Sequence, residues 1–141
     1  EEIKAFNTLD GHGLKMLQST GVRLAIITGR DAPGVAHRVN GLGIDYYLAG
    51  IHDKKAAYAQ LRAEAGVSEA QCAYIGDDVV DLPVMVRCGL AVAVPQAHAW
   101  VRHYADYETT AAAGAGAVRE LCELIMQAQG SLAGKLSGYV S

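Results

Sequence analysis

The fold of this chain is decided by the stretch AYIGDDVVDLPVM, residues 73–85. The apolar run at residues 72–75 predicts a buried strand, and Gly76 predicts the tight turn that ends it. Pro83 lies among apolar side chains in what we expect to be the first turns of a helix, since proline is tolerated at the start of a helix and not in its interior. The stretch therefore predicts a strand, a loop and a helix in succession, which is the repeating unit of an α/β fold.

The loop between that strand and that helix carries three carboxylates, Asp77, Asp78 and Asp81. Carboxylates this close together repel one another unless a cation or hydrogen-bond donors compensate. Mg²⁺ prefers oxygen ligands, and open α/β sheets bind their ligands just past the carboxyl ends of the strands. The loop therefore predicts a Mg²⁺ site, and the alternative is a solvated acidic turn in which Asp81 caps the helix.

The composition predicts one globular domain that spans residues 1–141. Hydrophobic residues make up 51% of the chain and charged residues 19%, which excludes a disordered segment, and no apolar run is long enough to cross a membrane. The net charge of −3 favours neither nucleic acid nor an anionic membrane surface as a partner. The 3 cysteines lie far apart and form no CxxC pair, so we expect reduced thiols in a cytoplasmic protein.

Apolar runs that predict buried strands alternate with segments that predict helices along the whole chain. This alternation predicts a parallel sheet with helices on both faces. The glycine-punctuated tail, residues 130–141, shows no pattern that would pack on the core of its own chain. The expected strands are residues 22–27, 44–49, 72–75, 90–94 and 105–109, with residues 1–8 a candidate edge strand, and the expected helices are residues 11–19, 31–42, 54–65, 82–88, 97–104 and 116–129.

Functional side chains are predicted just beyond three successive strands. Thr28 follows the first of them together with Gly29 and Arg30, Lys54 begins the helix after the second, and Asp77 follows the third. In a doubly wound sheet these strand ends lie at one edge, where a hydroxyl, an ammonium and a metal-binding carboxylate would together hold a phosphoryl group. Taken singly, Thr28 could be only a helix cap and Lys54 only one of two neighbouring exposed lysines.

These motifs resemble those of haloacid dehalogenase-type phosphohydrolases, and longer segments are similar to the 3-deoxy-D-manno-octulosonate 8-phosphate phosphatase family. The resemblance covers nearly the whole chain. It implies a capless three-layer Rossmann-like fold, Mg²⁺ as cofactor, hydrolysis of a sugar-acid phosphate through an aspartyl-phosphate, and a homotetramer that serves lipopolysaccharide biosynthesis. The matching segments are TGR at 28–30, Lys54, GDDxxD at 76–81, KAFN at 4–7, DGxG at 10–13, LGID at 42–45, VAV at 92–94 and GAVRE at 116–120.

The resemblance also implies a role for each matching position. Asp77 would be a Mg²⁺ ligand, with Asp81 and Asp78 supporting the water shell of the metal. Thr28 and Lys54 would bind the phosphoryl group. Contacts with the substrate are implied for Gly29, Arg30, Asn7, Asp10 and His12.

Two departures from the family pattern stand out. Relatives often carry arginine where Leu9 and Ala115 stand here, which leaves the substrate contacts at those positions open. The family's nucleophile and acid/base come from an Asp-x-Asp motif at the end of a first, central strand, and this sequence contains no Asp-x-Asp. We therefore expect an N-terminally incomplete chain in which the strands at residues 22–27 and 72–75 are not hydrogen-bonded to each other, with a strand-wide gap of roughly 9–10 Å between them.

Several functions remain open at this point. The first is a Mg²⁺-dependent phosphatase for 3-deoxy-D-manno-octulosonate 8-phosphate, or for a related sugar acid such as an N-acylneuraminate 9-phosphate. The second is a phosphorylation-receiving signalling domain, in which the acidic pair comes first in the chain and the lysine last. The order Thr28, Lys54, Asp77 argues against that class. The third is a non-catalytic member that only assembles, which the missing Asp-x-Asp motif keeps open.

Overall fold

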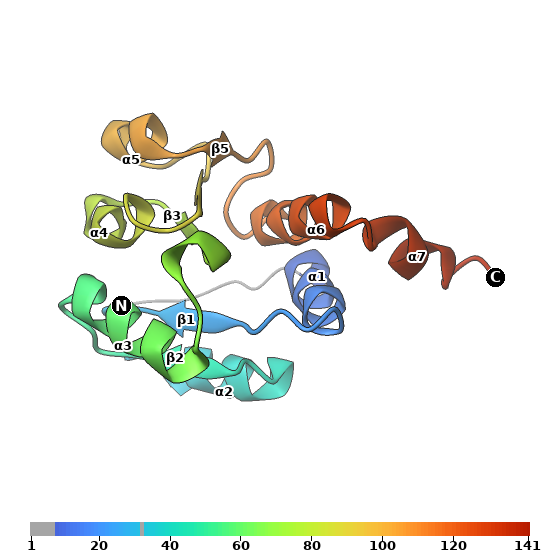
Figure 1. Ribbon diagram of the computed structural model, residues 1–141, viewed down its shortest axis with the longest axis horizontal. Coiled ribbons are helices and arrows are strands. Elements are labelled where there is room, and N and C mark those ends of the chain that lie inside the picture. The colour runs from blue at the N-terminus through green and yellow to red at the C-terminus, as the bar shows by residue number, and fades with distance from the viewer. Residues whose placement is uncertain (1–7, 32) are drawn as a thin grey trace.

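Strands and helices alternate along the chain, as the sequence predicts (Figure 1). The computed structural model describes residues 8–31 and 33–141, without the side chains of residues 8–10 and 35. The strands are β1 (Ala25–Ile27), β2 (Tyr46–Leu48), β3 (Ala73–Gly76), β4 (Leu90–Ala93) and β5 (Tyr107–Glu108). The α-helices are α1 (Thr8–Gln18), α2 (Pro33–Leu42), α3 (Lys54–Ala65), α4 (Leu82–Met85), α5 (Ala99–Tyr104), α6 (Ala117–Gln129) and α7 (Leu132–Ser137), and the 3₁₀ turns are η1 (Glu69–Gln71) and η2 (Val79–Asp81).

The strands pair in parallel, as expected, and form two separate sheets in the described part of the chain. β1 pairs with β2, with Ala25 opposite Tyr46, and the second sheet has the order β3-β4-β5, with Ala73 opposite Leu90. The prediction that the strands β1 and β3 are not hydrogen-bonded to each other is therefore confirmed for the described residues. Residues 1–7 of the candidate edge strand, predicted for residues 1–8, lie outside the described residues, and Thr8 begins α1 instead.

Four of the five predicted strands are shorter than expected, and beside β1 and β5 an aspartate side chain takes the place of a backbone partner. The Leu24 N–H donates to the carboxylate of Asp45 (2.7 Å), and β1 begins at the next residue, Ala25. In the same way the Ala91 N–H donates to the carboxylate of Asp106 (2.8 Å), and β5 is only two residues long. A side-chain carboxylate satisfies the N–H group but does not extend the ladder of the sheet.

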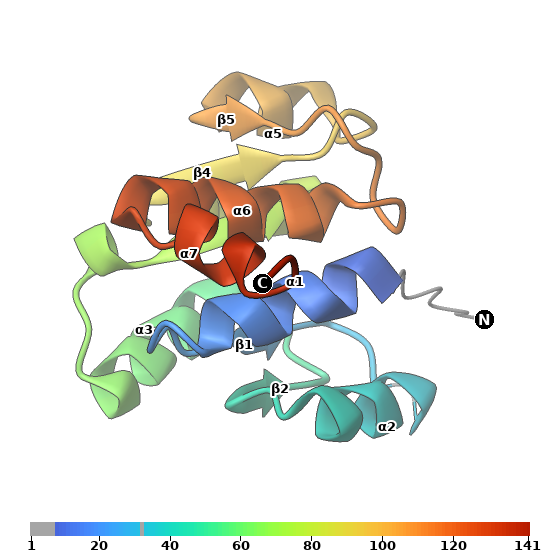
Figure 2. The same ribbon diagram turned by 90° about the vertical axis from the view of Figure 1, so that its right-hand side faces the viewer.

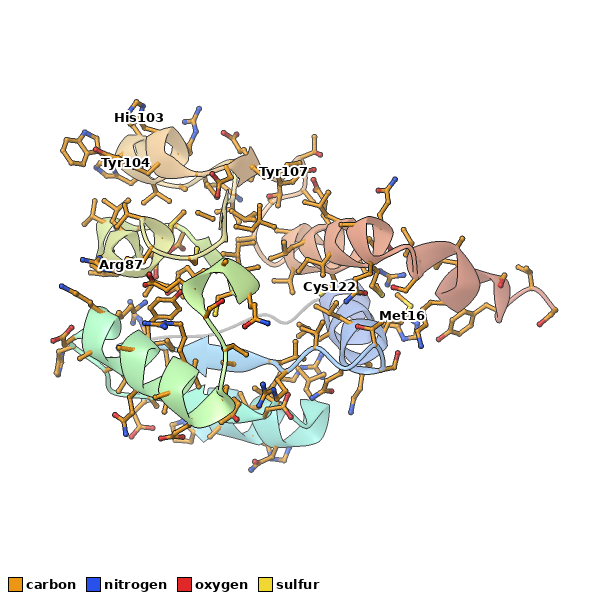
Figure 3. All side chains as sticks on the ribbon, in the orientation of Figure 1. Met16, Arg87, His103, Tyr104, Tyr107 and Cys122 are labelled. Carbon is orange, nitrogen blue, oxygen red and sulfur yellow. The ribbon has the colours of Figure 1, made fainter. Side chains whose placement is uncertain are left out.

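Helices cover both faces of the sheets. In Figure 1, α1 and α6 lie together on one side of the strands, and α3, α4 and α5 lie on the other. α1 and α6 pack directly on each other, and between them Met16, Cys122 and Met126 are buried (Figure 3). Gly13 permits this contact, because a Cβ atom there would lie 3.1 Å from the Arg119 Cα atom. A second core cluster, which includes Met85 and the strand β4, fills the space toward α4 and α5.

The C-terminal tail forms the helix α7 and returns to its own chain, in front of α1 and α6 in Figure 2. Leu132 packs against the core cluster between α1 and α6, and the ring of Tyr139 meets the ring of His12 edge-on, with centroids 5.5 Å apart. The expectation that the tail does not pack on its own core is therefore wrong at Leu132, where helix formation brings a leucine back to the core. None of the helices in the described ranges is long and apolar enough to cross a membrane.

Candidate active site

The carboxylate of Asp81 is the centre of a hydrogen-bond network at the carboxyl end of β3. Its Oδ1 atom accepts from Lys54 Nζ (2.8 Å) and from the Tyr74 hydroxyl (2.6 Å). Its Oδ2 atom accepts from the backbone N–H groups of Asp77 (3.0 Å) and Asp78 (3.2 Å). The residue is only 5% exposed, and a carboxylate offers about four acceptor positions, so this one has a donor for each of them.

Asp81 precedes α4 but does not cap it, because its side chain makes no hydrogen bond to that helix. The alternative interpretation of a solvated acidic turn with Asp81 as helix cap is therefore wrong. Asp78 is exposed, and its side chain accepts from the Val79 N–H (2.7 Å) at the start of η2. The loop therefore separates its carboxylates into a buried acceptor, Asp81, and the exposed Asp77 and Asp78.

The network determines the charge of its members. Burial alone would raise the pKa of Asp81, but the hydrogen bonds from Lys54, Tyr74 and the Asp77 N–H outweigh it and hold the pKa below its ordinary value. Burial, together with the neighbouring charge of Asp81, raises the pKa of Tyr74. At neutral pH the site therefore contains an ionised carboxylate, a protonated phenol and a lysine ammonium that forms an ion pair with the carboxylate.

Gly76 makes room for this arrangement. A Cβ atom at Gly76 would lie 2.6 Å from the Cβ atom and 2.9 Å from the Oδ2 atom of Asp81, closer than side chains approach each other. Because side chains alternate along a strand, Gly76 and Tyr74 present the same face of β3, and both meet Asp81 there. The glycine in the GDDxxD motif is therefore required by the packing of the last aspartate against the strand end.

The turn after β1 is held by backbone hydrogen bonds. The Thr28 N–H donates to the Leu48 carbonyl (2.9 Å), and the Ile51 N–H donates to the Thr28 carbonyl (2.9 Å). The Thr28 hydroxyl oxygen accepts from the Arg30 N–H (3.1 Å), which is a local turn and not the cap of α2. A Cβ atom on Gly29 would lie 3.4 Å from the Ile51 carbonyl, so the backbones of the two loops approach closely here.

The carboxylate of Asp81 contacts Lys54 through its side chain and Asp77 and Asp78 through their backbone N–H groups, so the structure places the helix start at Lys54 beside the acidic loop. In the described ranges no hydrogen bond joins Thr28 to Lys54 or to the acidic loop, so its place in the site remains a prediction. His12 is exposed and contacts the ring of Tyr139 in the tail. Among the other predicted substrate contacts, Asn7 lies outside the described residues, and so does the side chain of Asp10.

Sequence reasoning missed two members of the site. From the sequence no role is assigned to Tyr74, although strand alternation from Gly76 places it on the face that carries the motif. His98 donates its backbone N–H to the carbonyl of Asp77 (2.9 Å), and its ring Nδ1 accepts from the Trp100 N–H (3.0 Å). The backbone of Asp77 is thereby held from two sides, by Asp81 and by His98.

The fit of these residues to a Mg²⁺ ion is partial. Asp77 supplies an exposed carboxylate directly after β3, which is the donor type that Mg²⁺ prefers. The carboxylate of Asp81 already has its donors, so it acts on the site through the backbone of Asp77 and through Lys54. Within residues 8–31 and 33–141, no three side chains of His, Cys, Asp or Glu gather closely enough to hold a metal ion.

The chain is similar both to a family of hydrolases and to individual phosphatases of that kind. Residues 1–89 match the family of haloacid dehalogenase-like hydrolases. The 3-deoxy-D-manno-octulosonate 8-phosphate phosphatase of Yersinia pestis is 47% identical over 134 residues, which are 95% of this chain and 72% of that protein.

Two solved structures are similar over nearly the whole chain. A probable yrbi family phosphatase from Pseudomonas syringae has a TM-score of 0.97 at 48% identity, covering 100% of this chain and 80% of that one. The 3-deoxy-D-manno-octulosonate 8-phosphate phosphatase of Moraxella catarrhalis, in complex with a magnesium ion, a phosphate ion and a KDO molecule, has a TM-score of 0.95 at 41% identity and covers 99% of this chain and 80% of that one.

Proposed function

The chain belongs to the haloacid dehalogenase-like hydrolases, and on that premise we propose that the protein is a Mg²⁺-dependent phosphatase that hydrolyses 3-deoxy-D-manno-octulosonate 8-phosphate. The observation that carries the proposal is the fixed position of Lys54, which is held by Asp81 beside the loop of Asp77. The names of the similar proteins and the magnesium, phosphate and KDO bound to one of them support the substrate and the cofactor.

The chain's own residues have distinct parts in this proposal. Lys54 places a compact positive charge where it offsets the negative charge of the phosphoryl group. Asp77 contributes a carboxylate oxygen toward Mg²⁺, which when bound offsets charge and orients the phosphoryl group. The Thr28 hydroxyl, with the backbone at Gly29 and Arg30, binds phosphoryl oxygens at the end of β1. Asp81 keeps Lys54 and the Asp77 backbone in place.

The aspartyl-phosphate chemistry belongs to the proposal as well. It needs an aspartate that attacks phosphorus and a second acid that protonates the leaving oxygen. The described residues place no Asp-x-Asp pair beside Lys54, so they account for the binding of the phosphoryl group and for the stabilisation of its charge.

We further propose that the protein is a cytoplasmic homotetramer in which residues 130–141 reach toward a neighbouring subunit. The three cysteines are free thiols, which supports a reducing compartment. Leu136, Tyr139 and Val140 are 41%, 66% and 87% exposed, and this group of exposed apolar side chains supports a contact with another copy.

The test is a phosphate-release assay on the full-length protein with 3-deoxy-D-manno-octulosonate 8-phosphate and, for comparison, N-acetylneuraminate 9-phosphate. We expect hydrolysis of the first to depend on Mg²⁺ and to exceed that of the second in kcat/KM. Lys54→Ala should lower kcat/KM about a hundredfold or more, since it removes a charge that faces the reacting group. Lys55→Ala is the matched control, because Lys55 is the exposed next residue of the same helix. Activity that survives in Lys54→Ala at the wild-type level would refute the proposal.

A further inference from the structure

The hydroxyl of Tyr74 shares the Asp81 oxygen that holds Lys54. Tyr74 lies 2.6 Å from Asp81 Oδ1, and Lys54 Nζ lies 2.8 Å from the same atom. An ionised carboxylate only accepts hydrogen bonds, so the phenol is the donor. The ring of Tyr74 packs against the core cluster that contains Met85 and Ala91, which keeps the hydroxyl directed at Asp81.

Because Tyr74 and Lys54 share this oxygen, Lys54 can donate only a limited number of hydrogen bonds to Asp81. Each carboxylate oxygen accepts about two hydrogen bonds, and the Oδ2 atom already has the N–H groups of Asp77 and Asp78. With Tyr74 in one position on Oδ1, a single N–H group of Lys54 fills the last one. In the described part of the chain the Nζ atom of Lys54 hydrogen-bonds only to Asp81, so two of its three N–H groups are directed elsewhere.

Removal of the hydroxyl would leave an acceptor position empty on a buried carboxylate, which is costly. The ammonium of Lys54 is the cation already at that oxygen, and it would turn a second N–H group toward Asp81. Fewer N–H groups of Lys54 would then face a bound phosphoryl group.

We propose that Tyr74 is a positioning residue of the phosphatase site: by occupying one acceptor position of Asp81, it keeps two N–H groups of Lys54 available for phosphoryl oxygens. This inference rests on the proposed function, in which Lys54 binds the phosphoryl group. It extends that function to a residue that touches neither the phosphoryl group nor the metal.

The chain contains a matched control for loss of a tyrosine–carboxylate hydrogen bond. Tyr107, labelled in Figure 3, donates its hydroxyl to Glu120 at the same distance of 2.6 Å. Glu120 also accepts from the N–H groups of Thr110 (3.0 Å) and Ala111 (3.0 Å), so this network fastens a loop to α6. It contains no lysine, and Tyr107→Phe therefore tests the general cost of the lost bond.

The experiment measures Tyr74→Phe in the full-length protein, with kcat/KM for the sugar-acid phosphate and the inhibition constant of inorganic phosphate as readouts. We expect kcat/KM to fall about ten- to a hundredfold, as for other residues that orient a site from behind. The inhibition constant of phosphate should rise about tenfold, which corresponds to one hydrogen bond to a charged group. Tyr107→Phe should leave both within twofold of the wild type.

The inhibition constant separates positioning from a purely structural role, because a smaller folded fraction lowers kcat but does not change the affinity of the folded enzyme for phosphate. An unchanged inhibition constant in Tyr74→Phe, or an equal rise in Tyr107→Phe, overturns the inference. Lys54→Ala in the same assay distinguishes failure of the proposed function from failure of the role inferred for Tyr74. If Lys54→Ala has wild-type activity, the proposed function fails; if it is impaired while Tyr74→Phe is not, only the role of Tyr74 falls.

Discussion

Gly76 and Asp81 pack so closely that a Cβ atom on Gly76 would lie 2.6 Å from the Cβ atom of Asp81. Gly76→Ala must therefore displace the buried carboxylate, and with it Lys54. We expect a loss of about 1–3 kcal/mol in the free energy of unfolding, the usual cost of overpacking, together with a lower kcat/KM. Gly41→Ala is the control: apart from its chain neighbours and the backbone of its own helix, nothing lies within 4 Å of the Cβ position of this helical glycine, so alanine should stabilise by about 0.4–1 kcal/mol. Denaturant titration measures both, and equal stability of the two variants would contradict the prediction.

Asp77 is the proposed Mg²⁺ ligand, and Asp77→Asn should weaken Mg²⁺ binding. An amide oxygen lacks the charge that offsets the cost of removing water from the ion, so we expect affinity to fall at least about tenfold. Isothermal titration calorimetry of the full-length protein measures this. Asp78→Asn is the comparison, because the Asp78 side chain already caps η2. Equal Mg²⁺ affinity in the wild type and in Asp77→Asn would refute the assignment.

Asp81 gives the stability a defined pH dependence. The pKa of Asp81 is lowered in the folded protein, so its contribution is fully present above the unfolded pKa of about 4 and is lost as the pH falls through the lower folded value. We expect Asp81→Asn to cost about 3 kcal/mol at pH 7, because it leaves the ammonium of Lys54 without its counter-charge.

Denaturant titrations of the wild type and Asp81→Asn between pH 3 and pH 7 measure that contribution. The difference in unfolding free energy should be constant down to about pH 5 and should shrink at lower pH. Glu123→Gln, which breaks the ion pair between Arg119 and Glu123 (2.6 Å) one turn apart on α6, should cost no more than about 0.5 kcal/mol. A difference for Asp81→Asn that grows on acidification would show that the sign is wrong.

Two truncations separate the structural part of the tail from its proposed contact with a neighbouring subunit. Deletion of residues 138–141 removes Tyr139 and Val140, which are mostly exposed, and should change KM or kcat without lowering Tm. Deletion of residues 131–141 also removes Leu132 from its cluster and should cost about 1–2 kcal/mol in addition. Steady-state kinetics measure KM and kcat, thermal denaturation measures Tm, and light scattering measures the oligomeric state. Unchanged kinetics in both truncations would count against a role for the tail in a neighbouring site.

The local signals in the sequence were sufficient for the order of the elements from α1 to α6, though not for α7, and for part of the site. The helix α3 begins at Lys54 and ends at Ala65, as predicted, because both of its ends are determined within the segment. The side chain of Asp53 accepts from the Ala56 N–H (3.0 Å), and Gly66 adopts the left-handed conformation that closes the helix. Residues adjacent in the sequence therefore determine that Lys54 begins a helix. In the same way they determine that Asp77 follows a strand.

Contacts between distant segments could not be predicted from these signals. The bond between Lys54 and Asp81 joins residues 27 positions apart, and the one between Leu24 and Asp45 spans 21. Periodicity shows which face of an element is buried, but not which donor a buried carboxylate will meet there. That depends on the packing of β3, α3 and η2, which makes Asp81 a buried acceptor for Lys54 and for the backbone N–H of Asp77.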